Sequence, residues 1–265
     1  MSPNPSQTHA RAKGAALSLR SVVRRFGPES GPNSVLAVDG VDLEVGPGEF
    51  VALLGPSGCG KSTLLKLVAG LERPDRGSVR TDSFGRPHFR GFVFQDACLL
   101  PWRSTLENVA LPLELLGQSR AGARALAAEA LERVGLREAA GRLPRQLSGG
   151  MRMRASLARA LIAKPSLLLL DEPFAALDED ARHGLQDDLR ALWEDLGMTI
   201  LFVTHSVAEA AFLANRTVLL SPRPARVRHD RATDLPSPRP PGLRLTDAFL
   251  REMQALASLK RTSPP

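Results

Sequence analysis

Residues 55–63 have the residue types and the spacing that hold phosphate groups in proteins. The glycines of this stretch let the backbone turn N–H groups toward an anion, Lys61 adds a positive charge, and the Ser62 hydroxyl can bind a metal ion. The apolar run 50–54 precedes the stretch and residues 64–69 follow it, which indicates a strand that turns into a helix. The predicted phosphate-binding residues are Gly55, Pro56, Ser57, Gly58, Cys59, Gly60, Lys61, Ser62 and Thr63.

A second predicted anion site lies immediately before the predicted helix at residues 152–163. Ser148, Gly149 and Gly150 stand where this helix begins, and the N–H groups and positive dipole end of a helix N-terminus favour anions. The chain therefore carries two helix starts that can each bind phosphate.

Two adjacent acids, Asp171 and Glu172, follow four consecutive leucines. Such a run is typical of a strand buried on both faces of a parallel sheet, and functional groups gather at the carboxyl end of such strands. An aspartate at this place typically holds Mg²⁺ through water, and the neighbouring glutamate can accept a proton from an attacking water. The phosphate loop upstream makes a purely structural role for this pair the weaker hypothesis.

Two further polar residues follow apolar runs, Gln95 after residues 91–94 and His205 after residues 199–203. A glutamine or a histidine at a strand end is more often a satisfied structural residue than a functional one. Both are predicted at the same sheet edge as Glu172, which favours a functional interpretation. The Gln95 oxygen can then bind a metal ion or orient a water beside the phosphates.

The elements that must position these groups alternate between strands and helices. The predicted strands are residues 17–26, 35–45, 50–54, 91–94, 167–170, 199–203 and 216–220, with a local hairpin at 72–87. The predicted helices are residues 64–69, 106–116, 122–134, 152–163, 179–196, 206–213 and 243–259. This order predicts an α/β fold with a mainly parallel core sheet, an N-terminal antiparallel β subdomain, and an inserted helical subdomain at about residues 96–163.

Two aromatic residues have two interpretations each. Phe26, the only aromatic residue before Phe50, either fills the core or stacks on a nucleotide base. Trp102 follows Leu99, Leu100 and Pro101, and this apolar group is either a surface for a partner protein or part of the packing of the helical subdomain.

Composition limits the classes of function. The 265 residues are 43% hydrophobic, which is ample for a core, and they contain no apolar run of membrane-spanning length and no secretory signal pattern. Two cysteines form no disulfide framework and suit a reducing compartment. The formal charge of +7 fits a solvated basic surface, a nucleic-acid site, or closeness to an anionic membrane, but only 5% of residues are aromatic, which disfavours stacking on single-stranded bases.

The order of the motifs resembles that of the ATP-binding subunit of ATP-binding cassette (ABC) transporters, over roughly residues 17–227. The matching motifs are the P-loop at residues 55–63, the Q-loop at Gln95, the signature at residues 147–151, the Walker B strand at residues 167–172, the D-loop at residues 176–178 and the switch histidine at His205. Many NTPases share a P-loop, but a P-loop followed by Leu-Ser-Gly-Gly is highly specific.

Three short stretches resemble one importer branch of that family, which takes up nitrate, sulfonates, taurine and pyrimidine precursors. They are residues 100–102, 151–154 and 221–224. The chain departs from the wider family at Met151, where glutamine is usual, and at Phe26, where tyrosine is commoner.

The resemblance implies an ABC-type P-loop NTPase with ATP and Mg²⁺ as ligands. Residues 1–15 would be a disordered leader, residues 16–227 the ATP-binding domain, and residues 228–265 a short C-terminal extension. It further implies a homodimer in which each ATP lies between the P-loop of one copy and the signature of the other.

The resemblance also implies roles for single residues. Lys61 would hold the β and γ phosphates, Ser62 and Gln95 would bind Mg²⁺ with Asp171 behind a water, Glu172 would polarise the attacking water, and His205 would steady the γ-phosphate. From the other copy, Ser148, Gly149 and Gly150 would contact the γ-phosphate. Asp178 of the D-loop is a further predicted nucleotide-binding residue.

The implied partners are a second copy of the chain, transmembrane permease subunits and, indirectly, an extracytoplasmic substrate-binding protein, with no nucleic acid. The expected location is peripheral, on the cytoplasmic face of the cell membrane. A soluble ABC-type ATPase acting on nucleic acid or ribosomes is the alternative, although the chain has neither a long coiled-coil insertion nor a second cassette. A subunit that binds ATP without hydrolysing it is a second alternative, disfavoured by Glu172 and His205.

Overall fold

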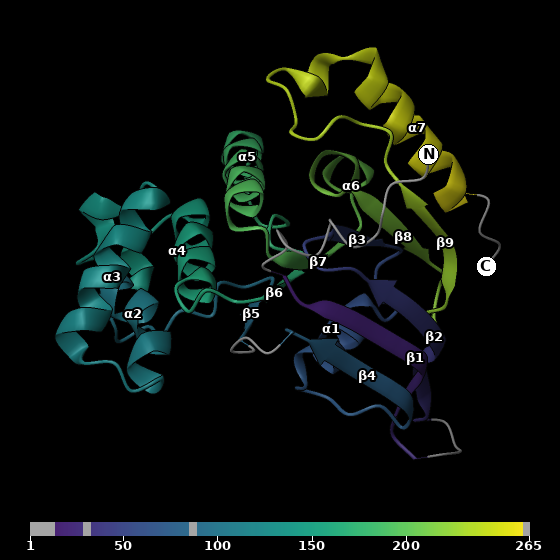
Figure 1. Cartoon of the computed structure of the whole chain (residues 1–265), viewed down its shortest axis with the longest axis horizontal. Coiled ribbons are helices and arrows are strands. Elements are labelled where there is room, and N and C mark those ends of the chain that lie inside the picture. Colours follow the sequence, from purple (N-terminus) through teal and green to yellow (C-terminus); the bar gives the residue numbers. More distant parts are fainter. Residues whose placement is uncertain (1–13, 29–32, 85–88, 262–265) are drawn as a thin grey trace. The chain divides into compact units, whose positions relative to one another are not determined.

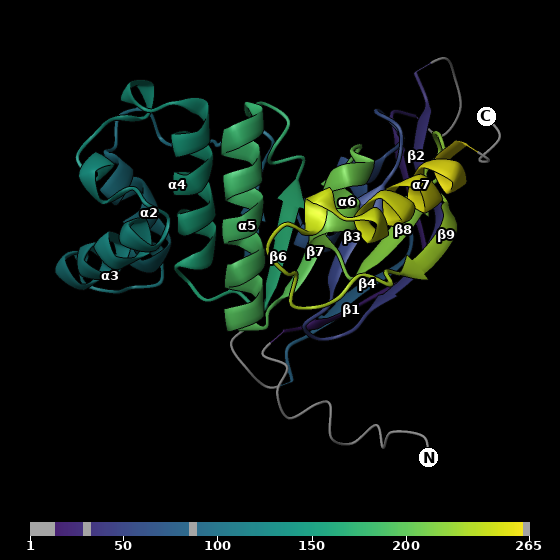
Figure 2. The same ribbon diagram turned by 90° about the horizontal axis from the view of Figure 1, so that it is seen from above.

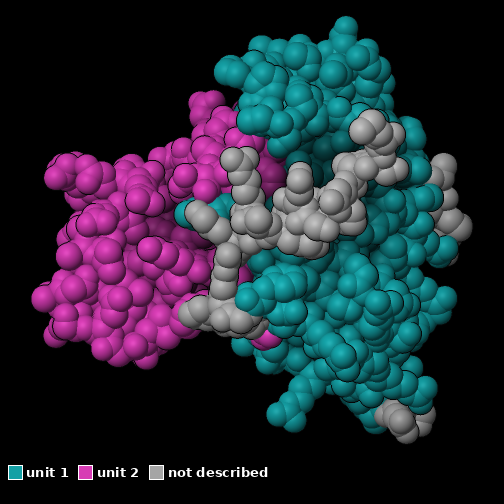
Figure 3. All heavy atoms as spheres, in the orientation of Figure 1, with its two compact units in different colours: residues 1–88, 196–265 teal, residues 89–195 magenta. Residues whose placement is uncertain are grey.

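The computed structural model describes residues 14–28, 33–84 and 89–261 (Figures 1 and 2). It divides into two compact units, which are described separately (Figure 3). Unit 1 comprises residues 1–88 and 196–265, and unit 2 comprises residues 89–195. Within the described residues, no helix has both the length and the apolar character needed to cross a membrane.

A three-stranded antiparallel sheet opens unit 1, in the order β2-β1-β4 (Figure 1). Its strands are β1 (Ala16–Phe26), β2 (Val35–Val45) and β4 (Arg76–Asp82). The alternating residues Val41, Leu43 and Val45 are buried, as expected for strands with one face on a core. The predicted antiparallel β subdomain is therefore confirmed.

The predicted hairpin at residues 72–87 is wrong. Strand β4 pairs along its length with β1, with Leu19 opposite Val79, and therefore closes a contact across some sixty residues of sequence. Residues 85–88 of that prediction lie outside the described part of the chain.

The second sheet of unit 1 has the strand order β7-β3-β8-β9. Strands β3 (Phe50–Leu54), β7 (Thr199–Thr204) and β8 (Arg216–Leu220) are parallel, while β9 (Val227–Ala232) is antiparallel to β8. Every residue of β3 and β7 is buried, which explains their unbroken apolar sequences. Since β9 begins at Val227, the sheet continues into the segment predicted to be a separate extension.

Among its described residues, unit 1 also contains the helices α1 (Lys61–Ala69), α6 (Val207–Leu213) and α7 (Asp247–Arg261) and the 3₁₀ turn η4 (Leu243–Leu245). The predicted C-terminal helix is confirmed, but it begins at Asp247 rather than at residue 243. Of the predicted leader, residues 1–13 lie outside the described residues, whereas Ala15 is buried and its carbonyl accepts a hydrogen bond from Thr199 Oγ1 at 2.6 Å.

Unit 2 pairs two parallel strands, β5 (Arg90–Val93) and β6 (Leu167–Asp171). Its helices are α2 (Thr105–Leu115), α3 (Arg120–Arg133), α4 (Gly149–Leu161) and α5 (Glu179–Leu196), with 3₁₀ turns η2 (Arg137–Ala139) and η3 (Pro144–Gln146). Helices α2, α3 and α4 pack together around a small apolar core that includes Val109, Ala127, Leu131 and Ala155. These helices form the predicted inserted subdomain.

Candidate functional site

The predicted phosphate loop connects β3 to α1. Gly58 and Gly60 both have left-handed backbone angles, with φ values of 73° and 117°. Helix α1 begins directly after the loop at Lys61, and Gly60 at its N-cap has no side chain that could bond to the first N–H groups of the helix. The described loop therefore has the form that presents backbone N–H groups to a phosphate.

Gly60 is required by its surroundings as well as by its φ angle. A Cβ atom at this position would lie 2.4 Å from the Ala37 carbonyl oxygen, and that backbone cannot move aside easily. Gly58 also has positive φ, but no atom lies within 4 Å of its hypothetical Cβ. The loop is thus packed tightly at Gly60 and open at Gly58.

Replacement of Gly60 by alanine is expected to destabilise the protein by about 3 kcal/mol or more, because it combines backbone strain with a clash. Gly58→Ala is the matched control and should cost only the backbone strain, about 1–2 kcal/mol. Chemical denaturation of both variants measures the difference. Equal losses of unfolding free energy in the two variants would contradict the described loop.

Lys61 lies across this loop. Its side chain is 3% exposed, and its Nζ atom donates hydrogen bonds to the carbonyl oxygens of Gly55 at 3.0 Å and Pro56 at 2.9 Å. The positive charge is therefore held at the loop itself, where phosphate oxygens would bind.

Cys59 has a different position from its neighbours. Its side chain is buried, and its N–H donates to the Pro56 carbonyl at 3.3 Å. The Cys59 side chain therefore packs inside the loop and does not face a ligand from the surface. The spacing of the motif did not predict this burial.

His205 leaves the sheet beside the phosphate loop. Strands β3 and β7 are neighbours, and Leu54 is paired with Thr204. Gly55 and His205, which directly follow these two residues, therefore start from the same edge of the same sheet. The turn at His205 is closed by the Ser206 N–H, which donates to Thr204 Oγ1 at 3.0 Å.

In unit 2, the pairing of β5 with β6 places Gln95 and the acids Asp171 and Glu172 at the carboxyl ends of neighbouring strands. Val93 is paired with Leu170, so the segments carrying Gln95 and Glu172 leave adjacent strands at one edge. Asp171 is 8% exposed, and Gln95 is exposed. The loop that follows Gln95 is held by Arg159, whose guanidinium donates hydrogen bonds to the carbonyl oxygens of Ala97 at 2.9 Å and Cys98 at 2.8 Å.

Glu172 has a backbone angle that its sequence does not reveal. Its φ is 44°, which is a left-handed conformation that side-chain-bearing residues rarely adopt. Residues held in such strained conformations cluster at functional sites, because the surrounding structure must impose them. This strained residue directly follows the buried strand β6.

The second predicted anion-binding stretch lies at the start of helix α4, where a helix start was predicted from the sequence. Ser148 is the N-cap, and its Oγ accepts a hydrogen bond from the Met151 N–H at 3.2 Å. Arg152 fixes the preceding residue by donating to the Leu147 carbonyl at 2.8 Å. Ser148 is exposed, so this helix start is available to a ligand.

Asp178 occupies the corresponding position before α5. Its Oδ1 accepts a hydrogen bond from the Ala181 N–H at 2.9 Å, so its carboxylate caps that helix. A contact of Asp178 with nucleotide stays a prediction.

Phe26 does not fill the core. It ends β1 with 37% of its surface exposed, and the guanidinium of Arg24 lies 4.7 Å from its ring centroid. Arg24 is itself held by Glu72 at 2.8 Å and Asp75 at 3.0 Å. An exposed ring at the end of a strand leaves the base-stacking hypothesis standing.

Comparison with known proteins gives consistent results. The family described as "ABC transporter" matches residues 38–175. The aliphatic sulfonates import ATP-binding protein SsuB of Ralstonia nicotianae is 47% identical over 92% of this chain and 84% of its own length. The taurine import ATP-binding protein TauB of Chromobacterium violaceum is 48% identical over 80% of this chain and 81% of its own.

A solved structure agrees with these relatives. The dimeric, post-hydrolysis ATP-binding cassette MJ0796 bound to ADP and Pi has a TM-score of 0.72 and 32% identity, over 82% of this chain and 98% of that one. Fold, loop geometry and relatives lead to the same assignment: the chain belongs to the ABC transporter family.

Proposed function

We propose that this chain is the ATP-hydrolysing subunit of a membrane importer for a sulfonate, taurine, nitrate or a related small solute. The observation that carries this proposal is the near-full-length identity, at 47% and 48%, to import ATP-binding proteins for aliphatic sulfonates and taurine. The described phosphate loop, with Lys61 bonded across it, supports ATP as the ligand.

The residues present fit ATP and Mg²⁺. The loop from Gly55 to Thr63 would hold the phosphates, and hydroxyl, amide and carboxylate oxygens from Ser62, Gln95 and Asp171 are donors that suit Mg²⁺. When bound, Mg²⁺ would neutralise phosphate charge. Glu172 would accept the proton of the attacking water, and His205 would steady the γ-phosphate.

A second copy of the chain would complete each nucleotide site. Two phosphate-binding helix starts in one chain, at Lys61 and Gly149, support an arrangement in which one nucleotide bridges two copies. The related MJ0796 cassette is described as a dimer bound to ADP and Pi. Ser148, Gly149 and Gly150 of one copy would then close on the γ-phosphate held by the other.

The membrane partner would dock on the loop at residues 99–103, at the cytoplasmic face of the membrane. Trp102 is 73% exposed, so it does not pack into the helical subdomain. A large exposed aromatic side chain is typical of protein interfaces. The substrate-binding protein on the far side of the membrane would act only through this partner.

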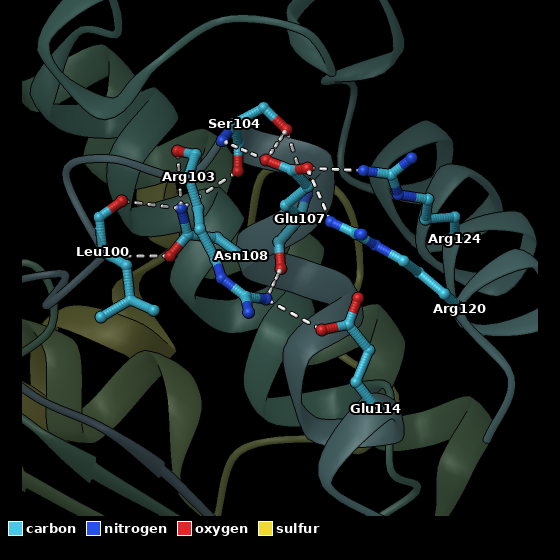
Figure 4. Close-up of polar contacts among 8 residues, drawn as sticks. All are labelled: Leu100, Arg103, Ser104, Glu107, Asn108, Glu114, Arg120 and Arg124. Atoms are coloured by element: carbon cyan, nitrogen blue, oxygen red, sulfur yellow. Dashed lines mark hydrogen bonds and ion pairs between the residues drawn. The ribbon is translucent and has the colours of Figure 1, made fainter. Parts of the chain in front are cut away.

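The buried side chain of Asn108 holds this loop through four hydrogen bonds to its backbone and to the start of α2. Asn108 is fully buried and accepts the Leu100 N–H at 2.7 Å, while its amide donates to the carbonyls of Leu100 and Arg103 at 3.1 Å each and Ser104 at 3.0 Å (Figure 4). One amide therefore fixes both ends of the turn that presents Trp102.

Charged groups fix the start of α2 beside this turn. Glu107 and Ser104 form a capping box, and Arg124 pairs with the Glu107 carboxylate (Figure 4). The hydrogen bond from the Ser104 N–H lowers the pKa of Glu107, so the carboxylate is favoured in the folded state. Arg103 reaches Glu114 at 2.9 Å. The docking loop is therefore preorganised before any partner binds.

Trp102→Ala is expected to weaken binding to the permease by about tenfold or more, as removal of an interface aromatic often does. Asn108→Ala should weaken it similarly without touching the partner, because the loop loses its support. Leu115→Ala, at an exposed leucine outside the loop, is the matched control. Pull-down of permease by purified variants measures the effect, and unaltered capture by Trp102→Ala would contradict this docking surface.

Co-purification of the chain with its permease and binding protein, followed by mass spectrometry of the bound small molecule, tests the proposed function as a whole. A sulfonate, taurine or nitrate is the expected result. Recovery of nucleic acid or ribosomes instead would favour a soluble ATPase.

A further inference from the structure

The C-terminal helix α7 lies beside α6, the short helix that follows His205 (Figures 1 and 2). The rings of Phe212 on α6 and Phe249 on α7 meet edge to face, with centroids 6.5 Å apart. Phe249 and Leu256 are buried, so the apolar face of α7 is part of the core of unit 1. The C-terminal segment is therefore an integral layer over α6.

Two arginines also hold the C-terminal segment against the rest of unit 1. Arg231 of β9 pairs with the buried Glu252 of α7 at 2.8 Å. The guanidinium of Arg244 lies 3.4 Å from the centroid of the Phe212 ring. The first contact ties α7 to the sheet, and the second ties the turn η4 to α6.

Arg239 closes the C-terminal end of α6. It donates to the carbonyls of Phe212 at 3.0 Å, Ala214 at 2.7 Å and Ala211 at 3.3 Å. The last carbonyls of a helix lack partners within the helix, and a cation there also interacts favourably with the negative end of the helix dipole. A helix of only seven residues, Val207–Leu213, thus receives its C-terminal cap from the C-terminal segment.

The other end of α6 is contacted by the last turn of α7. The Nζ atom of Lys260 donates a hydrogen bond to the backbone carbonyl of His205 at 2.9 Å. Within the turn, the Ser206 hydroxyl caps α6 by accepting the Glu209 N–H at 3.3 Å, and the Thr204 hydroxyl donates to the Glu209 carboxylate. Lys260 therefore connects the C-terminal segment to the peptide group of His205 itself.

We propose that the segment from Thr233 to Arg261 is a positioning element for the His205 turn, and that Lys260 is its positioning residue. The inference rests on the proposed role of His205 at the γ-phosphate. Fixing the His205 carbonyl limits rotation of the backbone that aims the imidazole. Loss of this contact lowers the fraction of molecules with His205 correctly placed, and therefore lowers kcat while leaving nucleotide affinity unchanged.

The test uses the full chain in complex with its permease. Lys260→Met removes the donor, Lys260→Arg retains one, and Arg251→Met removes the same charge from an exposed position of the same helix. Lys260→Met is expected to lower kcat for ATP hydrolysis about three- to tenfold, with Kd for ATP unchanged. Lys260→Arg should recover most of the rate, and Arg251→Met should match the parent protein.

Hydrogen exchange separates positioning from general stability. The amides of residues 204–209 should exchange faster in Lys260→Met, while those of residues 55–63 should not change. In a His205→Ala background, Lys260→Met should produce no further loss of kcat, since the two changes act through one group.

The outcomes are distinguishable. Parent-like kcat in Lys260→Met, or an equal further loss in the His205→Ala background, would overturn the positioning role while leaving the proposed function intact. Parent-like kcat in His205→Ala alone would overturn the proposed role of His205, and with it this inference.

Discussion

Replacement of Glu172 by glutamine is expected to leave ATP binding intact and to lower kcat by about two to four orders of magnitude. A positioned proton acceptor contributes roughly this factor to catalysis. The amide keeps the size of the side chain but cannot take the proton of the attacking water. The left-handed φ of 44° at this residue supports the assignment, because the fold imposes a strained backbone conformation on the residue proposed as the base.

The variant should also accumulate as a dimer when ATP is present, because the γ-phosphate that bridges two copies is no longer removed. Size exclusion with ATP, and phosphate release over time, measure the two effects. Glu179→Gln, an exposed carboxylate in the first turn of α5, is the control and should behave like the parent protein. Near-normal phosphate release by Glu172→Gln would exclude Glu172 as the base.

Ser148→Arg is expected to abolish ATP-driven dimerisation while the monomer still binds ATP. Ser148 is exposed at the N-terminus of α4, where the second copy would bring its nucleotide. An arginine there adds bulk between the helix and the phosphates, so the two copies cannot close. Equilibrium sedimentation with the Glu172→Gln protein as background, which holds the closed state, measures the dimer directly.

Loss of the helix cap alone does not account for the expected effect. Ser119 caps α3 in the same way, accepting the Gly122 N–H at 3.2 Å, and it is also exposed. Ser119→Arg should therefore cost the same stability, about 1 kcal/mol, and leave dimerisation unchanged. Dimers of normal stability in Ser148→Arg would contradict a nucleotide site shared between two copies.

The sequence predicted those parts of the fold whose residues are constrained locally. Strands β3, β6 and β7 are buried throughout, so their apolar runs marked them clearly. Ser148 and the two glycines after it were predicted to lie at a helix start, and α4 begins there at Gly149. The pairing of β4 with β1 was missed because partners far apart in sequence leave no local signal.

Within the candidate site, the residue types were predictable from the sequence, but the burial of side chains and the backbone conformations were not. Nothing in the sequence distinguishes Cys59, whose side chain is buried, from its neighbours in the loop. The left-handed φ of Glu172 and the hydrogen bond from Lys260 to the His205 carbonyl depend on tertiary packing. Phe26 had two interpretations, and only its exposure in the folded chain excluded the core.

The proposed import function is tested most directly by the rate of ATP hydrolysis by the chain assembled with its permease and binding protein in membrane vesicles, measured with and without solute. A sulfonate, taurine or nitrate is expected to raise this rate in the parent protein and to have no effect in Glu172→Gln. A rate that responds to none of these solutes, and rises instead with nucleic acid or ribosomes, would contradict the import function.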